Sequence, residues 1–185
     1  MLKLELPAQK IWDEENEVFV NFAGATLQLE HSLISLSRWE SIWHKPFLIS
    51  RPDERRSREE IYSYIECMSV TQSFDRNCFL AITDEDIRRV QAYIEDPMTA
   101  THFAEDPRKH GRSGVGKVIT SEYLYSLMFD AGIPKECEKW HLNRLMTLIR
   151  IISEREAKNG GKKDQGSFLR SFAAQKAASR ARIPK

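Results

Sequence analysis

The stretch GRSGVGK at residues 111–117 has most of the spacing of a nucleotide-binding phosphate loop. In the pattern G-x-x-x-x-G-K-[ST], backbone amides cradle the phosphates and the final hydroxyl holds Mg²⁺. Gly111, Gly116 and Lys117 fit the pattern, but Val118 stands where the hydroxyl should be. The preceding THFAEDPRK also lacks the apolar strand that leads into such a loop. The stretch therefore predicts a glycine-rich loop, and no cofactor is expected.

Other chemically active residue types also lack a catalytic or metal-binding pattern. The five histidines show no H-E-x-x-H spacing, and no serine stands in a G-x-S-x-G elbow. Cys67, Cys78 and Cys137 are odd in number and form no C-x-x-C pair, so neither a disulfide framework nor a zinc site is indicated. We expect buried, unreactive thiols in a reducing compartment, no bound metal and no enzymatic activity.

Charge is distributed unevenly along the 185 residues, although the net charge is only +1. Residues 158–185 hold eight Lys and Arg and one acid, a net charge of +7, which leaves about −6 on residues 1–157. The N-terminus lacks the apolar region of a signal peptide, and no run approaches the ~20 apolar residues that span a bilayer. We therefore expect an intracellular protein without a membrane partner.

Periodicity predicts a mainly α protein (α+β) with a small N-terminal antiparallel β-hairpin element and a basic C-terminal tail. Residues 1–157 are expected to form a single globular domain, with β structure in residues 1–30 and helices in residues 32–157. Residues 158–185 are expected to be a flexible linker followed by the basic tail, because NGGKKDQGS interrupts the helical pattern.

The β region is predicted from alternating leucines and a central glycine. Leu2, Leu4 and Leu6 alternate with polar residues, and a second Leu-x-Leu pattern follows at residues 27–29. Both patterns would put one apolar face inward. Residues 17–22 and 26–30 are predicted to pair around a three-residue loop that contains Gly24.

Capping residues and apolar spacing predict several helices. The longest, residues 134–157, has Pro134 in its first turn and one apolar stripe that includes Trp140 and His141. Residues 98–118 are predicted to be a long loop. The other expected helices are one beginning at Ser32 or nearby serines and ending at Lys45-Pro46, one capped by Ser57 with Glu60, one capped by Thr83 with Asp86 and ending before Pro97, and one running from Thr120-Ser121 to a C-cap at Gly132.

Residues that could bind a partner lie on these helices and in the tail. The tryptophans either anchor packing or form an exposed aromatic patch. Polar residues beside the apolar stripe form either a buried network or a surface site for a carboxylate. Two phenylalanines in the tail are four residues apart, as in an amphipathic protein-binding helix. The candidates are Trp39, Trp43, Trp140, His141, Asn143, Arg144, Arg150, Phe168 and Phe172.

Three segments resemble a family of tailed-bacteriophage proteins encoded in the tail gene cluster. They are LEHSLISLSRWESIWHKPFL (29–48), EEIYSYIECMS (59–69) and ITSEYLYSLMFDAGIPKECEKWHLNRLMTLIRIISE (119–154). Family members end in a similar basic, Ala/Arg-rich tail. The family is regarded as tail assembly chaperones, made from a gene near that of the tape measure protein. The resemblance implies a non-enzymatic chaperone that binds the tape measure protein in the host cell cytoplasm, with the tail tube protein as a second candidate partner.

Two other functions stay open from the sequence. The protein could be a structural tail or neck component that remains in the virion. It could also be a nucleic-acid-binding regulator that uses the basic tail to neutralise phosphates, although few aromatic residues accompany the basic ones. The tail could instead contact an acidic or amphipathic helical partner, or be solvated and unbound. The chain could also self-associate.

Overall fold

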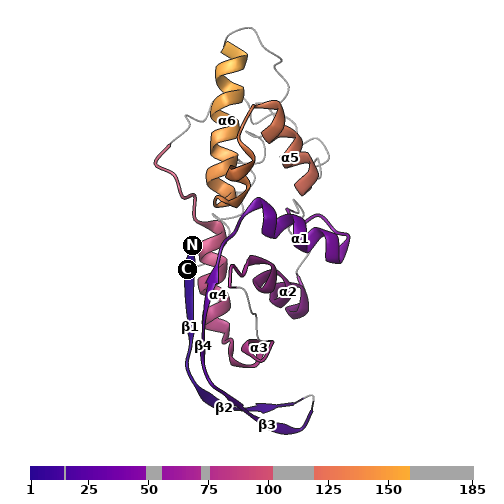
Figure 1. Cartoon of the computed structure of the whole chain (residues 1–185), viewed down its shortest axis with the longest axis vertical. Helices are drawn as coiled ribbons and strands as arrows, with labels where there is room; N and C mark the ends of the chain where they lie inside the picture. Colours follow the sequence, from indigo (N-terminus) through magenta and orange to yellow (C-terminus); the bar gives the residue numbers. More distant parts are fainter. Residues whose placement is uncertain (15, 49–55, 72–75, 102–118, 159–185) are drawn as a thin grey trace, which may run out of the picture.

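The computed structural model describes residues 1–14, 16–48, 56–71, 76–101 and 119–158. A paired β element at the N-terminus precedes the helices, so the chain is mainly α with a small antiparallel β part, as the sequence predicts. The molecule is elongated, with the end of the β element at one extreme and the last helix, α6 (Leu142–Lys158), at the other (Figure 1).

The β element is one long, bent hairpin. Strand β1 (Leu2–Leu6) pairs with β4 (Ala25–Leu29), and β2 (Gln9–Asp13) pairs with β3 (Val18–Phe22), both antiparallel. The ladder is interrupted between β1 and β2 and between β3 and β4, where the ribbon bends (Figure 1). The predicted pairing of residues 17–22 with 26–30 is therefore wrong. Gly24 has a φ of 85°, and such a glycine suits a strand bend as well as a hairpin loop.

The β1–β4 half of the hairpin carries part of the hydrophobic core. Leu4 lies opposite Leu27, and these side chains together with Leu6 and Leu29 are at most 3% exposed. This confirms the inward apolar face predicted from the two Leu-x-Leu patterns. Helix α2 (Arg58–Met68) packs against β4, and α4 (Asp84–Glu95) packs against β1.

The remaining helices complete the body around α1 (Leu33–Trp43), which contacts both α2 and α5 (Ser121–Asp130). A short helix, α3 (Cys78–Ala81), packs against β2, and a 3₁₀ helix, η2 (Lys135–Lys139), lies between α5 and α6. The predicted N-caps are confirmed at Ser32, at Ser57 with Glu60, at Thr83 with Asp86 and at Thr120. The C-cap of α5 is Ala131, and Gly132 follows it with a φ of 64°.

The single helix predicted for residues 134–157 is instead two elements. Trp140 has an extended backbone between η2 and α6, with φ −71° and ψ 159°. His141 forms a β-bridge with Ser32, and the N–H of Leu142 donates to the carbonyl of His31 at 2.7 Å. These tertiary hydrogen bonds interrupt the helix. They also attach α6 to the segment that connects β4 with α1.

Alanine in place of Gly24 is expected to lower the free energy of unfolding by about 2 kcal/mol. A Cβ there would lie 2.9 Å from the nitrogen of Ala8 and 3.1 Å from the carbonyl oxygen of Leu6, on a backbone with positive φ. Gly132 is the matched control, because an added Cβ meets nothing within 4 Å. Gly132→Ala should therefore cost only the backbone term, about 1 kcal/mol. Urea denaturation compares the two, and equal losses would contradict a clash at the bend.

Candidate functional site

Trp39 and Trp43 join α1 to α2. The indole N–H of Trp39 donates to the carbonyl of Glu60 at 3.0 Å, and that of Trp43 donates to the hydroxyl of Ser63 at 2.9 Å. The two indoles are stacked, with centroids 6.0 Å apart. Trp39 is 1% exposed, so the exposed-patch alternative is wrong for this residue. Trp43 is half-buried.

Trp140 differs from the other two because it precedes α6 and is 37% exposed. It does not lie on a buried helical stripe, since the extended backbone at this residue turns it away from the α6 periodicity. The guanidinium of Arg144 lies over its ring, 4.6 Å from the centroid. Arg144 is itself exposed, so the two side chains form an accessible cation–π pair.

His141, which is buried, and Asn143, which is half-buried, belong to one polar network at the start of α6, so the network alternative applies to Asn143. The Nε2 of His141 lies 3.0 Å from the carbonyl oxygen of Tyr93, and its Nδ1 accepts from the backbone N–H of Asn143. The Asn143 amide donates to the carbonyls of Ile94 at 3.0 Å and Asp96 at 2.6 Å. The start of α6 thereby satisfies carbonyls at the end of α4.

The remaining candidates are separate from this network or outside the described residues. Arg150 forms a salt bridge with Glu154 one turn later on α6, with 3.0 Å between Nε and Oε1. Phe168 and Phe172 lie outside the described residues, as do the glycine-rich stretch 111–117 and most of the predicted loop 98–118. The seven candidates within the described residues therefore do not form one site.

A second histidine, which sequence reasoning left unassigned, lies in the same region. His31 is 1% exposed, and its Nδ1 lies 2.6 Å from the hydroxyl of Tyr64. Its ring meets the ring of His141 edge-on at 5.2 Å between centroids. Burial raises the pKa of the Tyr64 hydroxyl, so this group remains a neutral hydrogen-bonding partner. The cluster joins α1, α2 and α6 at the centre of the body.

Glu40 is a buried carboxylate that sequence reasoning missed. Its Oε1 accepts from the backbone N–H of Phe47 at 2.8 Å, and its Oε2 accepts from the N–H of Ser121 at 2.6 Å. Ser121 is the first residue of α5, whose N–H groups lack partners within the helix. The sequence does contain a signal for the burial of Glu40, because this residue lies seven positions after Leu33 and four after Leu36, on the buried stripe of α1.

Glu60 connects the start of α2 to the residues that follow α1. Its Oε1 accepts from the ammonium of Lys45 at 2.8 Å, and its Oε2 accepts from the N–H of Ser57 at 2.9 Å. These bonds hold the pKa of the Glu60 carboxyl below its ordinary value of 4.5.

The lowered pKa of Glu60 predicts a pH-dependent contribution to stability. A depressed folded-state pKa stabilises the protein above the ordinary value, and the contribution is lost as pH falls through the folded-state pKa. Glu60→Gln should thus destabilise the protein at pH 7 and have a progressively smaller effect below about pH 4.5. Lys45→Met should reduce the same pH-dependent part. Urea denaturation between pH 7 and pH 3 measures both, and a constant difference across this range would contradict the assignment.

The three cysteines are free and buried, as the sequence predicts. Burial raises the pKa of the Cys67 thiol to about 11. This thiol therefore stays protonated near neutral pH and is a poor nucleophile.

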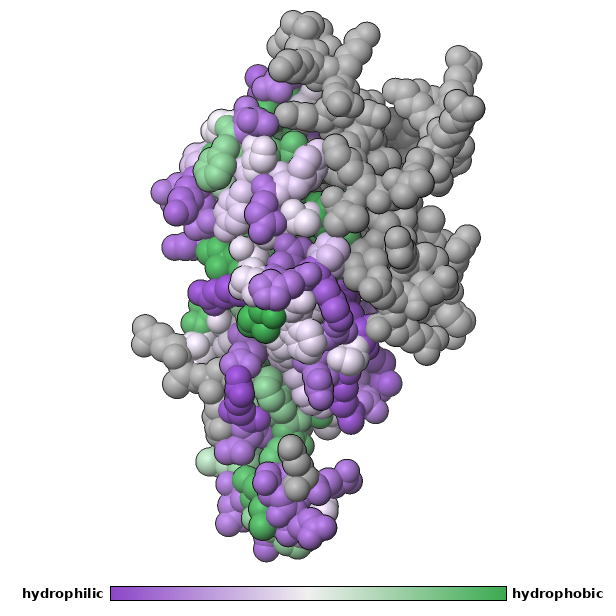
Figure 2. Space-filling model, turned by 90° about the vertical axis from the view of Figure 1, so that its right-hand side faces the viewer, coloured by the Kyte–Doolittle hydropathy of each residue, from purple (hydrophilic) through white to green (hydrophobic). Residues whose placement is uncertain are grey.

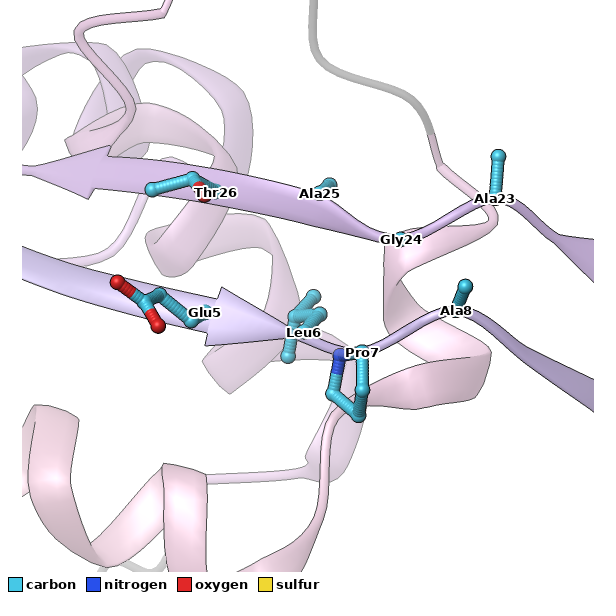
Figure 3. Close-up of a pocket in the computed structure, with 8 residues that line it drawn as sticks. All are labelled: Glu5, Leu6, Pro7, Ala8, Ala23, Gly24, Ala25 and Thr26. Atoms are coloured by element: carbon cyan, nitrogen blue, oxygen red, sulfur yellow. The ribbon is translucent and has the colours of Figure 1, made fainter.

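A groove of about 630 Å³ lies at the bend of the hairpin, lined by residues 5–8 and 23–26. Figure 3 shows that Ala8 and Ala23 point to the same side of the ribbon and that Gly24 faces Pro7 across it. Glu5 and Thr26 supply the polar side chains. Small residues leave room here for the strands to bend.

The end of the hairpin, formed by β2, β3 and the turn between them, exposes apolar side chains that sequence reasoning did not single out. Trp12 is 47% exposed, Val18 49% and Phe19 61%. Trp12 and Phe19 meet edge-on across the strands, with centroids 4.9 Å apart. Figure 2 shows hydrophobic surface among hydrophilic residues at this end of the molecule. The incorrect strand pairing hid this feature, because it left residues 9–13 without a partner strand.

Within the described ranges, no three His, Cys, Asp or Glu side chains are grouped so that they could hold a metal ion. None of the described helices combines the length and the apolar composition needed to cross a membrane. Comparison of the chain with models of protein families, with curated proteins and with solved structures gives no match. A proposal of function therefore depends on the sequence resemblance and on the surfaces described above.

Proposed function

We propose that the protein is a non-enzymatic bacteriophage tail assembly chaperone that binds the tape measure protein while the tail tube assembles. The resemblance of residues 119–154 to that family carries the proposal. A tape measure protein presents long amphipathic helices, which aggregate unless their apolar faces are covered. A protein with this role acts in the host cell cytoplasm.

The segments that carry the resemblance are in contact with one another. Residues 29–48 include α1, which packs against α2 and α5. All of α2 except its first residue falls within residues 59–69, and α5 falls within residues 119–154. Glu40 of the first segment holds the N–H of Ser121 in the third. In this chain the resembling segments therefore form one helical body, and the partner-binding surface has to be sought among exposed side chains.

Exposed aromatic residues on α5 and before α6 support a protein-binding role. Phe129 is 59% exposed and stacks with Tyr125 at 6.2 Å between centroids. Trp140 and Arg144 form the accessible cation–π pair. Trp, Tyr and Arg are the residues most enriched where protein interfaces concentrate their binding energy.

Co-expression with the tape measure protein of the same gene cluster tests the proposal. The soluble fraction of that protein is expected to rise when this chain is present, because its apolar helix faces are covered. Trp140→Ala with Arg144→Ala should reduce the effect. The neighbouring exposed pair Lys135→Ala with Glu136→Ala is the control and should not. An unchanged soluble fraction with the wild-type chain would contradict the proposal.

Purified phage particles provide a second measurement. A chaperone leaves the tail before the particle is complete, so mass spectrometry should find this chain far below the amount of the tail tube protein. Stoichiometric presence would contradict the chaperone and indicate a structural component of the virion.

A further inference from the structure

The hairpin end, residues 9–22, has an aromatic face with no described helix against it. Trp12 and Phe19 lie on that face together with Lys10, whose ammonium is 4.8 Å from the Phe19 centroid. The opposite face carries Phe22, which is buried, and Ile11 and Val20, which are half-buried near α3. The edge-on contact leaves 47% of Trp12 and 61% of Phe19 exposed. The pair therefore offers apolar area beyond what stabilises the two strands.

Acidic residues adjoin this aromatic face. Residues 13–17 read DEENE, four acids in five positions. Glu14 and Glu17 are both exposed. An acidic turn beside exposed rings suits a segment that is basic and also has apolar side chains, because Lys and Arg pair with carboxylates and pack over aromatic faces.

The chain itself contains a segment with this composition. Residues 159–185 hold seven Lys and Arg and a single acid, Asp164, a net charge of +6. Phe168 and Phe172 provide large apolar side chains within it. Its charge and its apolar residues both complement the hairpin end.

The fold indicates which copy supplies the segment. Residues 159–185 follow α6, whose far end and the hairpin end lie at opposite extremes of the long axis (Figure 1). A segment of 27 residues spans at most about 90 Å when fully extended, enough to reach a neighbouring molecule. To bind its own hairpin end, the segment would have to run back along the whole long axis of the molecule, which costs conformational entropy, whereas a second copy can approach it directly (Figure 1).

We infer that residues 159–185 of one copy bind the hairpin end of another copy through Glu14, Glu17, Trp12 and Phe19. The contact is heterologous, because different surfaces of the two copies meet, so it produces chains of molecules or rings. It is also weakened by salt, since exposed charges contribute to it. This inference does not rest on the proposed function, and its test uses this chain alone.

The receptor in the test is the full chain with its seven basic residues at 159–185 replaced by Gln, which vacates the hairpin end. The probe is a labelled peptide of residues 159–185, and fluorescence anisotropy measures its binding. We expect binding at 50 mM salt that weakens roughly tenfold or more by 300 mM. Absence of binding at 50 mM salt would overturn the inference.

Receptor variants locate the binding surface. Glu14→Lys with Glu17→Lys should weaken peptide binding at least tenfold. Glu59→Lys with Glu136→Lys changes the net charge equally at exposed positions outside the hairpin, and should change the affinity by less than about threefold. Equal losses in both pairs would mean attraction by net charge alone and would overturn the inference.

The aromatic contribution and the association of whole chains need their own measurements. Trp12→Ser with Phe19→Ser should also weaken binding, and unchanged affinity would contradict a defined contact. Both rings are exposed, and circular dichroism verifies that the variant keeps its helices.

In sedimentation velocity, the wild-type chain should associate with increasing concentration, whereas the Gln receptor should not. Identical sedimentation of the two would overturn the inference.

Discussion

Replacement of Trp39 by alanine is expected to lower the free energy of unfolding by about 3–5 kcal/mol. The indole is 1% exposed and meets the ring of Phe47 edge-on, with 5.1 Å between centroids. Removing it leaves a cavity between α1 and α2, and it also leaves the carbonyl of Glu60 without the indole N–H. Urea or thermal denaturation measures the loss.

Two further variants separate the causes of that loss. Trp39→Phe keeps much of the ring packing but removes the hydrogen bond, so we expect an intermediate loss of about 1–2 kcal/mol. Trp140→Ala truncates a tryptophan that is 37% exposed, and should cost less than about 1 kcal/mol. Equal losses for Trp39→Ala and Trp140→Ala would contradict the contrast between a buried and an accessible tryptophan.

Glu40→Ala is expected to destabilise the protein by about 3 kcal/mol, because two buried N–H groups lose their acceptor. Phe47 is 5% exposed and Ser121 is 1% exposed, so water does not readily replace the carboxylate at either position. The first turn of α5 should lose protection in particular. Chemical denaturation measures the global loss, and hydrogen exchange at the Ser121 amide measures the local one.

Glu40→Gln sharpens this test. The amide retains one acceptor oxygen and can satisfy one of the two N–H groups, so the loss should be intermediate between wild type and Glu40→Ala. Glu59, an exposed residue in the first turn of α2, provides the control, and Glu59→Ala should cost less than about 0.5 kcal/mol. A Glu40→Ala variant as stable as that control would contradict the role of Glu40 in joining α1 to α5.

The sequence predicted local features because their causes lie within a few residues. Ser57 with Glu60 and Thr83 with Asp86 form their capping boxes inside a single turn, so spacing is sufficient to identify them. The leucine alternation likewise fixed which face of β1 is buried. The buried free cysteines followed from their number and separation.

Nonlocal hydrogen bonds explain where the sequence reasoning was wrong. The sequence places Gly24 in a hairpin loop, but the partner of residues 18–22 is the strand at residues 9–13. Only the pairing between strands selects between these two registers. The helix predicted for residues 134–157 breaks at Trp140 and His141 because backbone groups there bond to residues 31 and 32. A periodic pattern does not contain those partners.

The candidate site residues show the same contrast between features with local causes and features that depend on contacts between distant segments. The sequence by itself determined the mainly α class, the caps, the acidic body with its basic tail, and which residues are aromatic or charged. Only the tertiary structure decided that Trp39 and His141 are buried while Trp12, Phe19 and Trp140 reach the surface. Exposure depends on which elements pack against a side chain, and that packing is set by contacts between segments far apart in the chain.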